Sequence, residues 1–196
     1  MKSRANVGRA ARGFTLIELM IVVSVMGALM VVGVPSMKSF IDEARVDAIA
    51  TELATDMALA KSTAAAQNCD VALTAKTGGW SAGWQVTYKT NNVTVASFSN
   101  GSTSASMVLP QCDPAGANTI VVKDHEAPSG AMTVAPKAST PTSAQFGFDR
   151  RLVGSTAPYV LIYPSSNASV RTRCVTVSAT GRISSTVATS GSRTTC

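Results

Sequence analysis

The chain has 196 residues, a formal net charge of +6, 45% hydrophobic residues, one histidine and four cysteines. This length leaves room for one folded domain beside a targeting or membrane segment. The sequence contains no G-x-S-x-G motif, no P-loop and no His pair at helical spacing, so we expect neither an enzyme nor a cofactor.

A basic leader followed by a long apolar run opens the chain. The leader holds four basic residues and no acid: Lys2, Arg4, Arg9 and Arg12. Residues 14–34 contain no Lys or Arg, and as a helix they would extend roughly 32 Å, enough to cross a bilayer core. The basic flank predicts that the chain after Pro35 lies on the non-cytoplasmic side. An ordinary secretory signal is the alternative, although Val32-Gly33-Val34 is a poor cleavage site for one.

Glu18 interrupts the apolar run. A carboxylate in a membrane segment costs about 2.5–3.5 kcal/mol, so Glu18 is either solvated near the interface or needs a partner.

The residues 12–19, Arg-Gly-Phe-Thr-Leu-Ile-Glu-Leu, with the leader before them and Pro35 after them, resemble the N-terminus of type IV prepilins and of type II secretion pseudopilins. The resemblance implies that prepilin peptidase cleaves after Gly13 and that Phe14 becomes N-methylated. It also implies that Glu18 pairs with the N-terminal amine of a neighbouring subunit, and that Pro35 lies at a kink of a long helix. Removing the leader leaves 183 residues and removes four of the six net positive charges.

After Pro35 the sequence predicts a continuing amphipathic helix that stops at Asn68. Its apolar stripe recurs at spacings of three and four: Val46, Ile49, Leu53, Met57 and Ala60. The acids are predicted to lie mostly on other faces: Asp42, Glu43, Asp47, Glu52 and Asp56.

From Cys69 onward, short alternating apolar runs predict antiparallel strands. The expected strands are Asp70–Ala75, Trp84–Lys89, Val93–Phe98, Ser106–Leu109, Thr119–Lys123, Ala144–Phe148, Tyr159–Tyr163, Arg173–Ser178 and Arg182–Thr186. Turns are expected at Asn91-Asn92, Asn100-Gly101, Pro128-Ser129-Gly130 and Thr180-Gly181. The fold class is therefore α+β, a long N-terminal helix packed on antiparallel sheet, as in pilins. We divide the chain into a leader (1–13), a transmembrane and filament-core helix (14–35), an amphipathic helix (36–68) and a periplasmic β-rich domain (69–196).

A second set of segments is similar in order and spacing to the GspH/FimT family of minor pilins and pseudopilins. These segments are residues 44–45, 59–62, 71–73, Trp80, 83–84, 146–149, 175–178 and 181–183. Members of the family sit at or near a filament tip and help to start assembly, so the resemblance implies an inner-membrane subunit whose partners are other pilins, prepilin peptidase and membrane lipid. Whether the filament is a type IV pilus or a type II secretion pseudopilus stays open. Trp80 and Trp84 are expected to pack a turn against the sheet.

The four cysteines lie on the predicted periplasmic side, and their even number in an oxidising compartment predicts two disulfides. Three connectivities are possible, and we prefer Cys69–Cys112 with Cys174–Cys196 because each pair closes a separate part of the sheet. A zinc site is the alternative, but the separations of 43, 62 and 22 residues contain no C-x2–4-C pair, so no metal is expected.

The C-terminal part of the chain is basic. Residues 150–196 contain six arginines and no acid: Arg150, Arg151, Arg171, Arg173, Arg182 and Arg193. Some FimT-like pilins bind DNA through a Gly-Arg-x-Arg motif, which Gly181-Arg182-Ile183-Ser184 resembles only in its first half. Double-stranded DNA is thus a candidate partner, bound through phosphates, while solvated strand-face arginines are the alternative. The lone His125, between acids, is expected at the surface rather than as a catalytic base.

Overall fold

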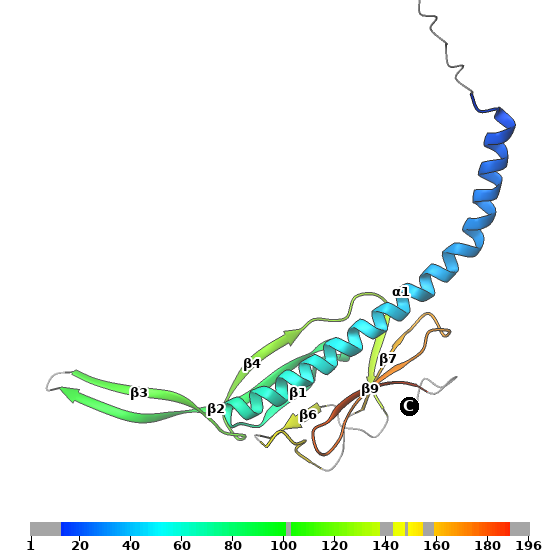
Figure 1. Cartoon of the computed structure of the whole chain (residues 1–196). Helices are drawn as coiled ribbons and strands as arrows, with labels where there is room; N and C mark the ends of the chain where they lie inside the picture. Colours follow the sequence, from blue (N-terminus) through cyan, green and yellow to red (C-terminus); the bar gives the residue numbers. More distant parts are fainter. Residues whose placement is uncertain (1–12, 101–102, 138–142, 148, 155–158, 189–196) are drawn as a thin grey trace, which may run out of the picture. The chain divides into compact units, whose positions relative to one another are not determined.

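The computed structural model describes residues 13–100, 103–137, 143–147, 149–154 and 159–188, and within these ranges the side chains of residues 32, 34–36, 93–100, 103–110 and 159 are not described. The chain forms two compact units, one ending at Phe40 and the other comprising Ile41–Cys196. The helix α1 (Leu16–Gln67) supplies most of the first unit and the first element of the second. Within the described residues the second unit adds nine strands, so the α+β class expected from the sequence is confirmed (Figure 1).

The C-terminal end of α1 has a well-defined cap. Asn68, directly after the helix, has a φ of 52°, in the left-handed region, and the Cys69 N–H donates to the Ala64 carbonyl at 3.0 Å. This bond from the second residue beyond the helix back to its last turn is the Schellman arrangement, in which Asn is a common substitute for Gly. The predicted helix stop at Asn68 is confirmed.

The first sheet is organised around one very long strand, β2 (Gly79–Asn100). The first part of β2 lies between β1 (Val71–Lys76) and β4 (Asn118–His125), and β6 (Ser143–Phe146) pairs with the other side of β1. Beyond Thr90, β2 pairs with β3 (Thr103–Cys112) instead of β4. The β1 pairing has already ended at Tyr88. Residues 91–100 and 103–111 therefore form a two-stranded ribbon.

The second sheet has the order β5-β7-β8-β9 and is wholly antiparallel. Its strands are β5 (Met132–Pro136), β7 (Tyr159–Pro164), β8 (Arg173–Val177) and β9 (Ile183–Val187). The turn between β8 and β9 contains Gly181 at a φ of 74°.

One hydrophobic core joins α1 to both sheets. The predicted stripe of α1 is confirmed, because all five of its members are buried: Val46, Ile49, Leu53, Met57 and Ala60. Trp80 and Trp84 are buried in the same core, with ring centroids 6.4 Å apart. The residues of this core cluster run from Val46 to Val177, all inside the second unit. This unit thus contains a complete core of its own.

The structure corrects three details of the predicted elements. Asn91 and Asn92 do not form a turn; they continue β2, so two predicted strands are one. The strand β5 was not predicted, since its five residues follow a loop and contain only one β-branched apolar residue, Val134. Asp56, expected on a solvent face, is completely buried.

Within the described residues, no helix is long and apolar enough to cross a membrane. The span expected over residues 14–35 stays a prediction.

Candidate functional site

The predicted processing site lies immediately before α1. Gly13 is exposed and Phe14 is 89% exposed, two residues before the helix begins. The Thr15 N–H donates to Glu18 Oε2 at 3.1 Å, and the Glu18 N–H donates to Thr15 Oγ1 at 3.3 Å. This reciprocal pair is a capping box, which satisfies two N–H groups at the start of the helix. The backbone at Pro35 is helical, and its side chain lies outside those described.

The first unit presents its apolar side chains to solvent. Large hydrophobic residues that are at least 60% exposed include Leu16, Ile17, Leu19, Met20, Val23, Leu29, Met30 and Val31. A monomeric soluble protein rarely exposes an apolar surface of this extent, so the segment is built to be covered by lipid or by other chains.

The C-terminal arginines fall into two groups. Arg173 donates to Asp47 through Nε at 2.5 Å and Nη2 at 2.9 Å, and Arg171 lies 3.3 Å from Glu43. These acids lie on α1, far away in the sequence, so the expectation of six unopposed arginines is wrong for these two. The hydrogen bonds to Asp47 raise the pKa of the Arg173 guanidinium, although its burial acts in the opposite direction. Arg151 lies 3.9 Å from Asp149, and Arg193 lies outside the described residues.

Arg150 and Arg182 come together with a lysine from the helix. A shallow pocket of about 510 Å³ is lined by Lys61 and Ser62 of α1, by Arg150, and by the β8–β9 turn with Arg182. None of the lining residues is acidic. Lys61 Nζ donates to the Gly181 carbonyl at 2.8 Å, which fixes the lysine against the turn. The arrangement concentrates three cationic side chains around one opening, as an anion site requires.

Gly181 is required where this pocket forms. At its positive φ an added Cβ would lie 2.1 Å from the Arg150 carbonyl oxygen, which only glycine avoids. Arg150 itself has a φ of 64°, a strained value for a residue with a side chain. The turn and the Arg150 loop are therefore in tight contact, and that contact holds the two arginines on one surface.

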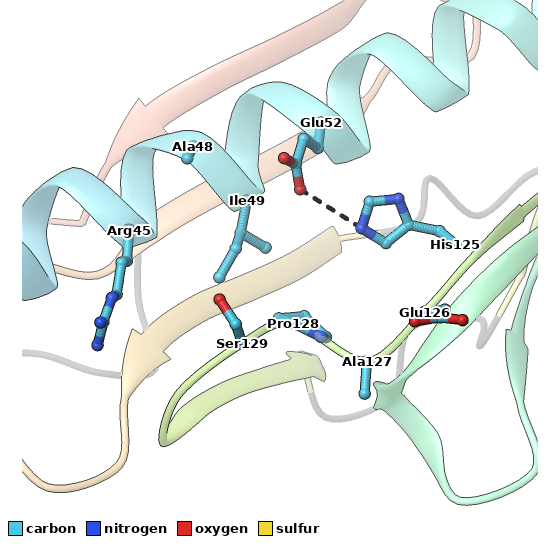
Figure 2. Close-up of a pocket in the computed structure, with 9 residues that line it drawn as sticks. All are labelled: Arg45, Ala48, Ile49, Glu52, His125, Glu126, Ala127, Pro128 and Ser129. Atoms are coloured by element: carbon cyan, nitrogen blue, oxygen red, sulfur yellow. Dashed lines mark ion pairs between the residues drawn. The ribbon is translucent and has the colours of Figure 1, made fainter.

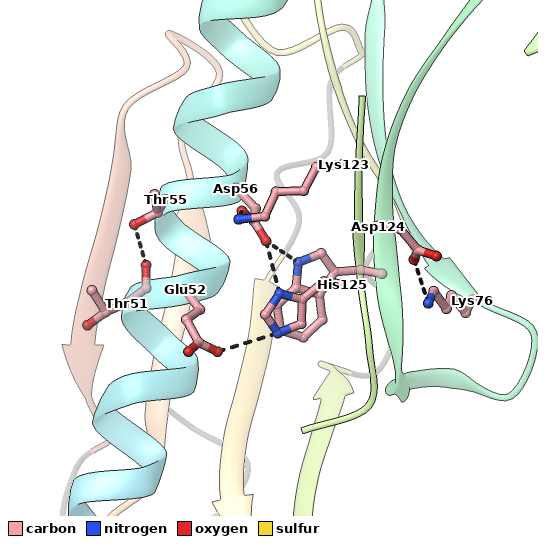
Figure 3. A network of polar contacts seen from close by, with 9 residues as sticks. Thr51, Glu52, Thr55, Asp56, Lys76, Lys123, Asp124 and His125 are labelled. Carbon is pink, nitrogen blue, oxygen red and sulfur yellow. Dashed lines mark hydrogen bonds and ion pairs between the residues drawn. The ribbon is translucent and has the colours of Figure 1, made fainter. Parts of the chain in front are cut away.

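A buried polar network joins α1 to the first sheet (Figure 3). The Asp56 carboxylate, completely buried, accepts hydrogen bonds from Trp84 Nε1 at 2.8 Å and from Lys123 Nζ at 2.5 Å. His125 Nδ1 lies 3.4 Å from Asp56, and its Nε2 lies 3.4 Å from Glu52. The His125 ring stacks on Trp84 with centroids 4.0 Å apart. His125 is thus a half-buried link between two acids of the helix, which corrects the expected surface position.

A pocket of about 280 Å³ adjoins this network (Figure 2). Arg45, Ile49 and Glu52 line it from α1, and the chain from His125 to Ser129 lines it from the other side. Arg45 lies against Gly130, where an added Cβ would stand 3.1 Å from its Nη1. The only hydroxyl among the lining side chains is that of Ser129. We assign this pocket no chemistry.

On the other face of β4, Asp124 pairs with Lys76 at 2.5 Å. The hydrogen bond from Lys76 is the main cause that lowers the pKa of the Asp124 carboxyl. Successive residues of β4 therefore take part in two separate polar contacts, because they point to opposite faces of the sheet.

The structure joins Cys69 and Cys112 by a disulfide, with Cα atoms 5.6 Å apart, the pairing that the sequence analysis prefers. This bond ties the residue after the α1 cap to the base of the β2–β3 ribbon. Cys174 is buried in β8, and its preferred partner Cys196 lies outside the described residues. The described residues contain no group of three or more His, Cys, Asp or Glu side chains that could hold a metal ion.

Sequence reasoning missed one cationic member of the basic pocket, Lys61, and the centre of the buried network, Asp56. Lys61 and Asp56 both lie on α1, which the sequence analysis treated as a packing element. The spacing of Asp56 does carry a signal, because it directly precedes Met57, a member of the apolar stripe, and follows Leu53 by three residues. That spacing places Asp56 beside the buried face.

Comparison with known proteins gives two family matches. The model of the type II transport protein GspH family matches residues 50–181, two thirds of the chain, and the prokaryotic N-terminal methylation motif matches residues 8–34. Both agree with the resemblances found in the sequence.

Two crystal forms of the type IV minor pilin FimU from Pseudomonas aeruginosa strain PAO1 are structurally similar to the chain. The first is 19% identical, covers 74% of this chain and 90% of the FimU chain, and has a TM-score of 0.51. The second is 19% identical, with coverages of 71% and 91% and a TM-score of 0.48. At this identity the first comparison supports the fold. No curated protein sequence matches the chain.

Proposed function

Because this chain belongs to the GspH family of type II transport proteins, whose members are minor pilins and pseudopilins, we propose that it serves as a membrane-anchored minor pilin of a type IV pilus. In this proposal prepilin peptidase cleaves between Gly13 and Phe14, Phe14 is methylated, and the N-terminal part of α1 leaves the inner membrane to join the filament core. The second unit stays on the periplasmic side and, after assembly, near the filament tip. The role is structural, not enzymatic.

The observation that carries this proposal is the contrast between the two units. The first has exposed apolar side chains along its helix, whereas the second buries a complete core without any residue before Val46. The core of the second unit is complete without this apolar segment, and the segment is unfavourable in water. It is therefore suited to lie in the lipid bilayer before assembly and to pack against neighbouring subunits after assembly. The minor pseudopilin of a type II secretion system uses the same features and is the alternative.

The capping box supports a specific role for Glu18. In the monomer its carboxylate accepts the Thr15 N–H and so has an intramolecular partner. In the filament we propose that it pairs with the amine of Phe14 from a neighbouring subunit.

The test uses three variants expressed in a pilus-forming host. Gly13→Val is expected to block loss of the leader, measured by mass spectrometry of the membrane fraction. Gly27→Ala is the matched control, since an added Cβ there meets nothing within 4 Å, and it should be processed normally. Glu18→Ala should be processed but missing from sheared filaments. Normal incorporation of Glu18→Ala would contradict the pairing, and normal processing of Gly13→Val would contradict the whole assignment.

The basic pocket favours a second function, capture of double-stranded DNA by phosphate contacts. Lys61, Arg150 and Arg182 line one opening without an acid, and the two arginines are among the six that the sequence analysis names as candidates. A site of this kind binds without sequence preference, and its affinity falls steeply with salt.

DNA binding is tested by fluorescence anisotropy with a labelled duplex at several salt concentrations. The Arg150→Ala, Arg182→Ala variant should lose binding at every salt concentration at which the wild type binds. Arg171→Ala is the matched control, because Arg171 is paired with Glu43 and lies outside the pocket, and it should bind like the wild type. If the wild type itself does not bind at low salt, the DNA function is wrong while the pilin function stands.

A further inference from the structure

The strand β4 is exposed on three sides over its first five residues. Asn118, Thr119, Ile120, Val121 and Val122 are all solvent-exposed, so neither face of this part of the strand is covered. One edge of β4 pairs with β2, and no other described strand pairs with its outer edge. Ile120, Val121 and Val122 are 39%, 50% and 38% exposed. An uncharged apolar edge strand of this kind is a template for pairing with another strand.

The same chain supplies an uncharged strand that fits this edge. Residues 90–112, which include the whole β2–β3 ribbon, contain no Asp, Glu, Lys, Arg or His. The β3 strand pairs only with β2 among the described strands, so its outer edge is also available. A two-stranded ribbon is marginally stable alone and gains from a third strand.

The topology excludes pairing of the two edges within one molecule. On β2, Thr90 is paired with both Cys112 of β3 and Asn118 of β4, so these two strands lie on opposite edges of β2. Their outer edges therefore face away from each other. A β3 strand that covers β4 has to come from another molecule.

We propose that the outer edge of β4, at Asn118–Val122, binds the β3 edge of the ribbon of a second copy of this chain. The absence of charge on both strands favours this occupant, because pairing buries no unpaired charge. The contact joins two different surfaces, so it is heterologous: each copy offers one ribbon and one β4 edge, and copies add head to tail. The pairing is β-augmentation, in which main-chain hydrogen bonds extend the β4 sheet.

The experiment uses the domain that begins at Ile41, which contains the complete core, and measures its mass by sedimentation. Its average mass should rise with concentration from monomer to beyond dimer, at concentrations on the order of 10 µM to 1 mM, as expected for a small interface. An Ile120→Lys, Val121→Lys variant places a charge on each face of β4 and should stay monomeric. Val187→Lys is the matched control on the edge strand β9, and it should associate like the wild type.

A second variant tests the occupant. Replacing residues 93–109 by Asn-Gly closes the hairpin directly after the Asn92–Pro110 pair and leaves β4 and the Cys69–Cys112 disulfide intact. This variant should also be monomeric, while an equimolar mixture of the two monomeric variants should form a dimer and nothing larger. Both must retain the wild-type thermal unfolding of the core. A wild type that stays monomeric, or either variant that associates as the wild type does, would overturn the proposal.

Discussion

The Asp56→Ala substitution should destabilise the second unit more than any exposed ion-pair variant. Asp56 is completely buried and accepts the Trp84 indole N–H at 2.8 Å, so its removal leaves a buried donor without an acceptor, at a cost of about 1–3 kcal/mol. Lys123 loses its partner too, but its side chain is 42% exposed and can return to water, which limits that loss to about 1 kcal/mol. The expected total is about 2–4 kcal/mol.

The assay is urea unfolding of the domain that begins at Ile41, followed by tryptophan fluorescence, since Trp80 and Trp84 are both buried. With an m-value of about 2 kcal/mol/M, the midpoint should fall by about 1–2 M. Asp56→Asn keeps an oxygen for Trp84 and loses only the charge, so it should cost about 1 kcal/mol. Asp124→Ala, which breaks the exposed pair with Lys76, is the control and should cost at most about 1 kcal/mol. If Asp56→Ala unfolds at the wild-type midpoint, or Asp56→Asn costs as much as Asp56→Ala, the hydrogen bond to Trp84 does not carry the stability assigned to it.

Three further predictions concern acid stability, the turn and the disulfide. The pKa of Asp124 is lowered in the folded state, so its carboxylate adds to the free energy of unfolding above the ordinary carboxyl pKa, and this stabilisation is lost as the pH falls through the folded-state pKa. The Asp124→Asn variant should therefore lose less stability than the wild type below about pH 4, measured by thermal unfolding at several pH values. Gly181→Ala should lower the free energy of unfolding by about 2 kcal/mol or more, because of backbone strain and the clash with Arg150. Gly79→Ala, also at positive φ but with open space around it, should lower it by only about 1–2 kcal/mol. Equal unfolding midpoints for the two variants would contradict the clash. The Cys69→Ser, Cys112→Ser variant opens a loop of 43 residues and should lose about 4 kcal/mol by the chain-entropy model, read from urea unfolding, and a loss below about 1 kcal/mol would reject that model here.

Local patterns in the sequence were sufficient for the helix and for most strands. The stripe from Val46 to Ala60 repeats at helical spacing, and Asn68 carries the conformational preference that ends a helix, so both could be predicted from neighbours in the chain. The pair Asn91-Asn92 is typical of a turn, but it also fits an extended strand when a partner strand lies at its edge. The partner strand β3 decides between the two outcomes, and its register depends on contacts distant in the sequence.

The candidate functional residues likewise divide into those that the sequence alone identifies and those that only the structure brings together. The processing motif is a linear segment, so Gly13, Phe14 and Glu18 could be identified directly from residues 12–19. The basic pocket is not linear: Lys61, Arg150 and Arg182 meet only because α1 crosses the β8–β9 turn. Charge counts along the chain also overestimated the basic surface, since Glu43 and Asp47 on the helix neutralise Arg171 and Arg173.

The spread of the contacts that α1 makes has a mechanical consequence. Asp47 binds Arg173 of β8, Asp56 binds Lys123 of β4, and Lys61 binds the carbonyl of Gly181, so polar contacts to both sheets follow one another along the helix. Just beyond its last turn, Cys69 is covalently joined to Cys112. A force that pulls on α1 from its N-terminal end is therefore shared between two sheets and a covalent bond. The helix cannot be drawn out of the domain without opening the whole core, and tension on a filament would be borne by the domain as one body.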